Sequence, residues 1–288
     1  MFISTRKIWY ALSSVLVLGS ILAFSVWGLK LGLEFSGGTL AEYQVSPAPV
    51  AADVATLASA AGAEAPQVVP TGSGVIVRAK GISSDAHKAL ADAMKKKYPS
   101  AVEVRFESIG PSISAELRSK AVTAVIATLI LIMLYIAWSF RKVGGRIQSW
   151  KYGVVVALSG LHDAIIPVGV FSVLGHFGNF EVDSAFVAAI LTILGYSIND
   201  TIVVFDRVRE NLLKTTGTIG EVVEHSIRQT VARSINTSLT VVLSLLSVYF
   251  FGGASTKSFA LALTIGVVVG TYSSIFIAAP MLVDWQKK

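Results

Sequence analysis

Ionisable side chains inside apolar stretches are the features of this sequence most suited to chemistry. Asp200 lies in G-Y-S-I-N-D-T-I-V-V-F-D-R (195–207), six residues before Asp206 and the basic residues behind it. Six helical residues span about 9 Å, so the Asp200 carboxyl would lie deeper than bulk water easily reaches. Burial favours the protonated carboxyl and a nearby cation favours the ionised one, and this competition can make a proton switch. The alternative is a static hydrogen bond between helices, aided by Asn199 and Ser197.

Ionisable side chains occur at two further places in or beside the apolar stretches. Arg233 opens the next apolar stretch and is a candidate partner for Asp200, although an arginine at a helix end can also reach back to the membrane interface. His162 and Asp163 interrupt another apolar stretch. Adjacent helical residues point about 100° apart, and histidine titrates near neutral pH. A structural polar contact and a role in proton relay are equally open for this pair.

Long apolar runs must position these groups. Four of the runs carry no charge, the run over 152–175 is broken only by His162 and Asp163, and the run over 184–206 is broken by Asp200 and closed by Asp206. The chain has 288 residues, of which 53% are hydrophobic and only 15% charged, against about 25% charged in ordinary soluble domains. A helix needs about 20 apolar residues to cross a bilayer, and each of six runs is long enough. We expect membrane spans over residues 8–29, 121–140, 152–175, 184–206, 234–256 and 258–283.

The first run could instead be a secretory signal peptide, because Arg6 and Lys7 precede it. Its length exceeds a typical signal core and no clear cleavage site follows, so a retained anchor is favoured. Lys and Arg also predict the orientation, because they concentrate in cytoplasmic loops. Arg141, Lys142, Arg146 and Lys151 lie between the second and third runs, and Lys287 and Lys288 end the chain. Both termini are therefore expected in the cytoplasm.

Composition excludes several classes of protein. There is no cysteine, so disulfides, thiolate metal sites and thiol nucleophiles are excluded. We find no metal-binding motif, no nucleophile–base set and no phosphate-binding loop, and we expect neither an enzyme nor a bound cofactor or metal. The net charge of +6 is mainly a topology signal. It leaves room for contact with membrane lipids, but no nucleic-acid-binding motif accompanies it.

Residues 31–119 are expected to form an extracytoplasmic domain between the first two spans. Alternating apolar residues predict strands at 41–45, 67–70, 74–78 and 102–108. Helices are predicted at 50–61 and at 84–98, the second with Ser84 as its cap. In the last strand Val102, Val104 and Phe106 should share one face. The order β-α-β-β-α-β is the α+β ferredoxin-like pattern. His87 is expected on an exposed helix face.

The predicted organisation therefore has three parts. Residues 1–30 hold the cytoplasmic N-terminus and the first span, residues 31–119 the outer domain, and residues 120–288 the other five spans. A cytoplasmic amphipathic helix is expected near 218–232, either on the membrane surface or packed under the bundle.

Two glycine motifs flank the outer domain. Gly37 and Gly38 permit unusual backbone angles or close packing, and Gly110 and Pro111 fix a turn before the second span. They are either fixed turns where the chain leaves the bilayer or hinges that let the domain move. These residues alone do not separate the two interpretations.

Several motifs together resemble the SecF family of the bacterial protein-export machinery, part of the SecDF group in the resistance–nodulation–division superfamily. The resemblance covers nearly the whole chain, and its most specific part is the long span-four motif around Asp200. The motifs are G-L-E-F-S-G-G-T (32–39), I-G-P-S (109–112) followed by Glu116-Leu117, L-H-D (161–163), G-Y-S-I-N-D-T-I-V-V-F-D-R-V-R-E-N (195–211), A-R-S-I-N-T-S-L-T (232–240) and Y-F-F-G-G (249–253).

The resemblance implies a partner and a mechanism. SecF pairs with SecD in the inner membrane, each giving six spans to a twelve-span bundle that docks on the SecYEG channel. The pair helps to draw unfolded polypeptides outward, using protons that move down their gradient. A carboxylate in the span-four motif and an arginine opening span five belong to the proton path, which here implies Asp200 and Arg233, with Asn199 beside them. The outer domain is implied to be a moving part. For His162 and Asp163 the resemblance implies no role.

Two other classes remain as alternatives. One is a half-size proton-coupled exporter of small molecules, which small-molecule efflux without an export defect would support. The other is a purely structural membrane scaffold. It would be indicated if Asp200→Asn left secretion and its gradient dependence unchanged.

Overall fold

The computed structural model describes residues 2–72, 74–141, 147–178 and 180–286. Lys142, Arg146, Lys287 and Lys288, which contribute to the predicted orientation, lie outside these ranges. The chain divides into two compact units, a helical unit formed by the residues before 31 and after 120, and a sheet unit formed by Leu31–Lys120.

The helical unit confirms the predicted membrane class, because six of the described helices are long and apolar enough to cross a bilayer. A helix satisfies its backbone hydrogen bonds internally, which a span in lipid requires. These helices are α1 (Arg6–Trp27), α5 (Pro111–Ser139), α6 (Ser149–Phe177), α7 (Ser184–Lys214), α8 (Ile219–Phe251) and a last one built from α9 (Ala254–Ser273), η1 (Ser274–Ala278) and α10 (Ala279–Gln286).

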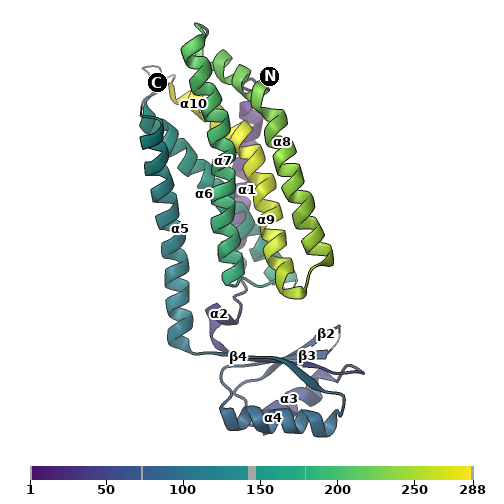
Figure 1. Cartoon of the computed structure of the whole chain (residues 1–288). Coiled ribbons are helices and arrows are strands. Elements are labelled where there is room, and N and C mark those ends of the chain that lie inside the picture. Colours follow the sequence, from purple (N-terminus) through teal and green to yellow (C-terminus); the bar gives the residue numbers. More distant parts are fainter. Residues whose placement is uncertain (1, 73, 142–146, 179, 287–288) are drawn as a thin grey trace. The chain divides into compact units, whose positions relative to one another are not determined.

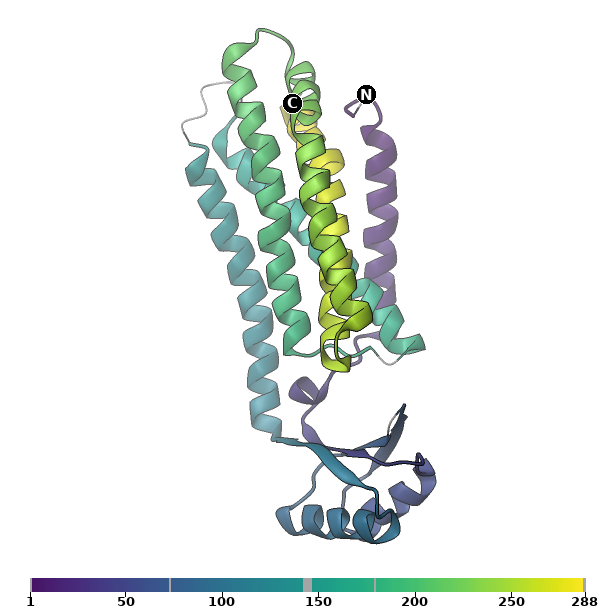
Figure 2. The ribbon, with the colours of Figure 1, turned by 45° about the vertical axis from the view of Figure 1, so that its right-hand side comes forward.

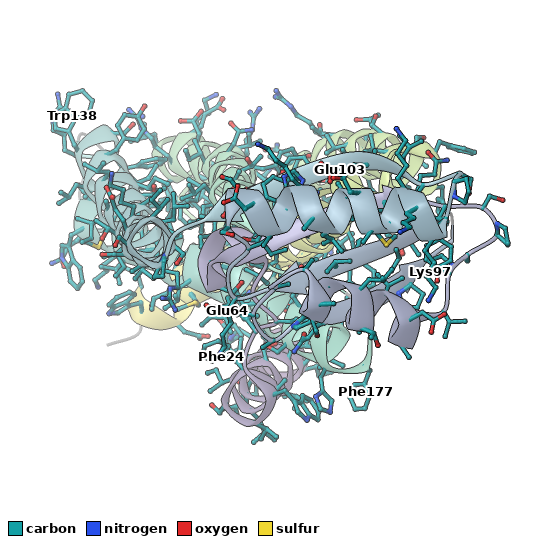
Figure 3. The ribbon with its side chains drawn as sticks, turned by 90° about the horizontal axis from the view of Figure 1, so that it is seen from below. Phe24, Glu64, Lys97, Glu103, Trp138 and Phe177 are labelled. Atoms are coloured by element: carbon teal, nitrogen blue, oxygen red, sulfur yellow. The ribbon has the colours of Figure 1, made fainter. Side chains whose placement is uncertain are left out.

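The two ends of the chain lie at the same end of the helical unit (Figures 1 and 2). Arg6 on α1 pairs there with Asp284 on α10 at 2.9 Å. Large apolar side chains face outward around the bundle, among them Phe24, Trp138 and Phe177, which lie at its periphery (Figure 3). Such an outer surface suits lipid.

Close helix packing in this unit depends on small residues. On α9, Gly266 and Gly270 are four residues apart and face Ile193 and Ser197 of α7. Gly169 of α6 faces Ser20 of α1 in the same way. Small residues let helix backbones approach closely in membranes, where burial of apolar surface gives little driving force. These contacts fix which faces of α1, α6, α7 and α9 meet.

The predicted cytoplasmic amphipathic helix near 218–232 is continuous with the fifth span. Thr218 and Glu221 form a capping box that starts α8, and the helix then runs without interruption to Phe251. Val222, Val223 and Ile227 are buried within the chain. Of the two predicted alternatives, the apolar face therefore packs against the bundle and does not lie on a membrane surface.

The sheet unit has the predicted ferredoxin-like topology. Its four strands are antiparallel in the order β2-β3-β1-β4, and α3 and α4 cover one face (Figure 1). Lys97 of α4, labelled in Figure 3, pairs with Asp53 of α3 at 3.0 Å. The elements are α2 (Leu33–Ser36), β1 (Gly38–Gln44), α3 (Ala51–Ala60), β2 (Gln67–Thr71), β3 (Gly74–Ala79), α4 (Ser84–Lys97) and β4 (Val102–Ile109).

Two local predictions in this unit are wrong. The cap of α4 is Ser83, not Ser84, because Ser83 has the extended backbone of a cap and accepts a hydrogen bond from the Ala86 amide. The predicted alternation of β4 also breaks, because the register with β1 shifts between Glu42 and Tyr43. An irregularity of this kind sends the side chains beyond it to the opposite face.

The register shift gives His87 a partner. Ala41 pairs with Phe106 and Tyr43 with Glu103, so Phe106 and Glu103 share the face that α4 covers. His87 stacks on Phe106 with ring centroids 3.7 Å apart and lies 2.9 Å from a Glu103 carboxylate oxygen. His87 is therefore half-buried and paired, not on the freely exposed face that the sequence predicts.

Candidate functional site

Asp200 is a buried acid in the middle of α7. Its side chain lies against α8, where the Ser234 hydroxyl donates a 2.6 Å hydrogen bond to Oδ1. Asp200 is 8% exposed, and its Oδ2 has no hydrogen-bond partner among the described residues. One hydrogen bond is few for a buried carboxylate, which can accept about four. A free, desolvated oxygen of this kind is suited to binding a proton.

The structure does not bring the other predicted members of the proton path to Asp200. Asn199 and Arg233 are both exposed. Arg233 precedes Ser234 on α8, and adjacent helical residues point about 100° apart. Because Ser234 faces Asp200, Arg233 faces away from it. No ion pair joins Arg233 to an acid within the described ranges.

His162 and Asp163 are central to a second polar cluster, in which four helices take part. Their neighbours are Ser13 of α1, Ser197 of α7, and Tyr272 and Ser273 of α9, and these six residues are called the His162 cluster below. His162 Nδ1 lies 2.7 Å from Asp163 Oδ1. Asp163 is fully buried, and His162 is 9% exposed. The predicted polar support by His162, Asp163 and Ser197 is thus one connected group.

The other four residues of the cluster contact the two atoms of the His162–Asp163 pair that do not face each other. Ser197 and Ser273 donate hydrogen bonds to Asp163 Oδ2, the second at 2.8 Å. On the other side, His162 Nε2 lies 3.1 Å from Ser13 Oγ and 2.9 Å from Tyr272 Oη. The Ser13 and Tyr272 oxygens are 2.7 Å apart. Every polar atom of the His162–Asp163 pair has a partner.

A short π-helical segment follows this cluster on the last helix. Ser274 begins η1, and its hydroxyl is 2.7 Å from that of Thr201 on α7. Single π-helical turns inside α-helices are frequent at functional sites. The Thr201–Ser274 contact adds a hydroxyl pair between α7 and η1, next to the His162 cluster.

Sequence reasoning misses four of the eight residues that form the His162 cluster and the Asp200–Ser234 contact. Ser13, Tyr272, Ser273 and Ser234 lie in runs that are predicted as plain spans. One signal was available, since T-Y-S-S (271–274) puts four hydroxyl groups in succession inside a charge-free stretch. Which of them would face Asp163 depends on helix packing that the sequence does not give.

The two glycine motifs lie together, where the chain enters β1 and where it leaves β4. Gly37 and Gly38 have φ of +72° and +117°, and Gly38 pairs with Ile109, directly before Gly110. A Cβ on Gly38 would lie 2.6 Å from the Ala79 carbonyl oxygen. Pro111 is the first residue of α5, a position where its missing N–H is not needed. The residues that enter the sheet and those that leave it are thus side by side.

These sites contain side chains that can carry or release a proton. No cluster of three or more metal-ligating side chains occurs in the part of the chain that the structure describes. The groups present are carboxyls, an imidazole and hydroxyls buried among membrane-length helices. The fold and these sites define a multi-pass membrane protein with an ionisable centre inside its helical bundle.

Comparison with known proteins identifies the family. Residues 89–288 match the family model described as "Protein export membrane protein SecD/SecF, C-terminal", and residues 24–49 match the "SecD/SecF GG Motif". The "Protein translocase subunit SecF" of Thermobaculum terrenum is 38% identical, covering 98% of this chain and 93% of the relative. That of Haemophilus influenzae is 37% identical, covering 98% and 85%. The chain belongs to the SecF family of protein translocase subunits.

Solved structures agree with this family assignment. The crystal structure of SecDF from Thermus thermophilus, titled a translocon-associated membrane protein, matches the whole of this chain with a TM-score of 0.86 and 32% identity. SecDF in its super-membrane-facing form matches 99% of it with a TM-score of 0.71 and 33% identity. This chain spans 38% of the length of each of those SecDF chains. The resemblance drawn from the motifs is confirmed, and relatives that are translocase subunits agree with the expectation that the chain is not an enzyme.

Proposed function

We propose that this chain is the SecF-type half of a proton-driven export machine in the bacterial inner membrane. It would pair with a SecD partner, and together they would supply a twelve-span bundle that docks on the SecYEG channel. The relatives' name and the length of the SecDF chains, of which this chain matches 38%, support a partner of this kind. Proton flow through the pair would help to draw unfolded polypeptide outward.

The orientation follows from the basic residues. Arg6 and Lys7 precede α1, whereas the 176–183 connection has neither Lys nor Arg. By the positive-inside rule, both termini are cytoplasmic and residues 31–119 are extracytoplasmic. The domain boundaries proposed above, 1–30, 31–119 and 120–288, place one span before the outer domain and five after it.

Asp200 carries the mechanism. Its burial on α7, together with an Oδ2 that no described residue hydrogen-bonds, is the observation on which the proposal rests. In the protonated form the carboxyl is neutral and suits an apolar surround. Once ionised it needs a cation, and Arg233, one residue from Ser234, could reach it after a rotation of α8. Asn199, beside Asp200 on the exposed side of α7, would face water or the partner.

Movement would reach the outer domain through the glycine motifs. Gly37 and Gly38 precede β1, and Gly110 and Pro111 follow β4. Because both connections are adjacent, a rotation at this point would move the sheet unit as one body. Translocating polypeptide is the partner proposed for that unit.

The test is gradient-dependent secretion in cells that carry Asp200→Asn as their only copy. The amide cannot exchange a proton, so we expect the gradient-dependent part of export to fall at least tenfold. Asp206→Asn is the matched control, because Asp206 lies six residues further along α7 with its carboxylate exposed. That variant should export normally. Co-purification of SecD with each variant checks that the complex is intact.

Other outcomes distinguish the alternatives. Normal gradient dependence of Asp200→Asn in an intact complex would refute the proton role and favour a scaffold. Loss of small-molecule efflux with unchanged export would favour an exporter instead. A broken complex would call for Asp200→Glu, which keeps the acid and should restore part of the export.

A further inference from the structure

The hydrogen bonds of the His162 cluster determine where its protons lie. Asp163 Oδ2 accepts from two serine hydroxyls, and Oδ1 lies 2.7 Å from His162 Nδ1. A carboxylate that accepts at both oxygens is satisfied in its ionised form. The neighbouring Nδ1 must then be the nitrogen that carries hydrogen, because two acceptors cannot bond. Asp163 thereby selects one tautomer of His162.

Only Nε2 of His162 is left to gain or lose a proton. It faces Ser13 Oγ at 3.1 Å and Tyr272 Oη at 2.9 Å, and these two oxygens bond to each other at 2.7 Å. Hydroxyls can donate or accept. The three atoms therefore form a small ring in which the direction of each hydrogen bond can reverse.

Both protonation states can be reached by reversing the hydrogen bonds of this ring. With neutral His162, Tyr272 donates to Nε2 and Ser13 donates to Tyr272. With a proton on Nε2, the imidazole donates to Tyr272 and Tyr272 donates to Ser13. The Ser13 hydroxyl must then turn to a new acceptor, for which helical serines commonly use a carbonyl one turn earlier. A purely structural contact would need only one of these arrangements.

The groups around His162 also favour a proton on its imidazole. From the packed elements, α1 presents Ser13, α7 presents Ser197, and α9 presents Tyr272 and Ser273, so Tyr272 is the one further titratable group in the cluster. Asp200 is three residues along α7 from Ser197 and is bonded to α8. No lysine or arginine of the described chain pairs with Asp163. A proton on His162 is the available positive charge beside that carboxylate.

We propose that the His162–Asp163 pair is a second proton-binding site, separate from Asp200, which is loaded and unloaded at His162 Nε2 through Tyr272 and Ser13. For each proton loaded one N–H bond forms at Nε2. Tyr272 gives up its O–H proton to Nε2 and takes that of Ser13, and Ser13 takes a proton from hydronium, so each hydroxyl ends with one O–H bond; unloading is the reverse. Binding at this site is independent of export, whereas its use in export rests on the proposed function.

Protonation of His162 would change a hydrogen bond made by α1. Ser13, Ser20 and Ala23 are the three residues that α1 buries, and Ser13 is the one that touches the ring. Reversal of the ring changes the bond that joins α1 to α6 and α9. The chain continues from α1 into the sheet unit, so protonation of His162 is coupled to the helix that leads to the outer domain.

Nitrogen NMR of the full chain in lipid bilayers tests this site. The sequence has four histidines, so protein labelled with ¹⁵N-histidine gives four pairs of ring signals. Single substitution of His87, His176 and His225 assigns three pairs and leaves His162. We expect Nδ1 of His162 to carry hydrogen over the whole pH range in which the protein stays folded, while Nε2 gains a proton as the pH is lowered.

Variants that keep His162 sharpen the test. Removal of one hydroxyl by Ser13→Ala or Tyr272→Phe should change the proton affinity of Nε2 by about 2- to 10-fold, the equivalent of one net hydrogen bond. Ser14→Ala is the matched control, since Ser14 is the exposed neighbour of Ser13, and it should leave the affinity unchanged. The Asp200→Asn variant should also leave it unchanged, which separates this site from the proposed proton path.

Two results would overturn the inference. One is an Nε2 that keeps a single protonation state over that whole pH range, which would make the pair a structural contact. The other is an equal change of affinity in Ser13→Ala and Ser14→Ala, which would show that the hydroxyl ring plays no part. Neither result would bear on Asp200, because export is not the readout.

Discussion

The seam between α1 and α6 gives a sharp test of the helix packing. Gly169 of α6 lies where an added Cβ would overlap the Cα, Cβ and Oγ atoms of Ser20 on α1. Two of these atoms cannot move away by a side-chain rotation, so Gly169→Ala must push the two helices apart. Ser20 and Gly169 are each seven residues from Ser13 and His162, about 10 Å along their helices. The same displacement should therefore weaken the Ser13–His162 contact.

The expected cost comes from two opposing terms. Alanine in a helix interior is better than glycine by about 1 kcal/mol, and overpacking typically costs about 1–3 kcal/mol. Gly19→Ala is the matched control, because Gly19 is on α1 and an added Cβ would meet nothing within 4 Å. The propensity gain is common to both variants. The difference in their free energies of unfolding is thus the packing cost, about 1–3 kcal/mol, with Gly169→Ala the less stable.

Unfolding by SDS in mixed micelles measures this difference. Trp9 of α1 stacks on Phe276 with ring centroids 3.9 Å apart, so near-ultraviolet circular dichroism follows the docking of α1. Equal stability of Gly169→Ala and Gly19→Ala would refute the close contact between α1 and α6. It would also remove the structural basis for sensing a proton through Ser13.

Three further variants test the sheet unit and the start of α8. Gly38→Ala should destabilise the sheet unit by about 1–2 kcal/mol, because the positive φ of Gly38 disfavours a side chain. Gly81→Ala is the control and should not destabilise it, because an added Cβ there would meet nothing within 4 Å. Hydrogen exchange of the sheet amides in the full chain measures both variants. Leu90→Ala should cost about 2–5 kcal/mol by the same measurement, because it empties a fully buried position of the α4 core. Thr218→Ala should cost about 0.5–2 kcal/mol by loss of the cap on α8, seen as faster exchange in its first turn, and unchanged exchange there would contradict the capping box.

The membrane spans could be predicted from sequence because their signal is local. A long apolar run with few or no charges is nearly sufficient to predict a span, and each predicted run coincides with a long helix. The ferredoxin-like order follows equally from short alternating segments and their turns. Neither inference requires knowledge of which elements touch.

Predictions that depend on which elements pack against each other were less accurate. The alternation of β4 assumes an uninterrupted period of two, and the shift opposite Glu42 and Tyr43 breaks it. The pairing of Asp200 with Arg233 assumes that residues opening adjacent spans face each other, and in the structure Ser234 takes that place. Burial of Asp200 was predictable from its depth in the run, but its partner is fixed by the rotation of α8.

Helix α7 connects the two acidic sites. Ser197 reaches Asp163 on α6, and Asp200, three residues later and about 4.5 Å further along the helix, accepts from Ser234 on α8. A three-residue step turns a helix by about 300°, so the two side chains lie on neighbouring sides of one cylinder. Any shift or rotation of α7 that changes the surroundings of Asp200 must also change the hydrogen bond of Ser197 to Asp163. Asp163 and Asp200 are thus held by neighbouring sides of the same helix, with no direct contact between the carboxyls.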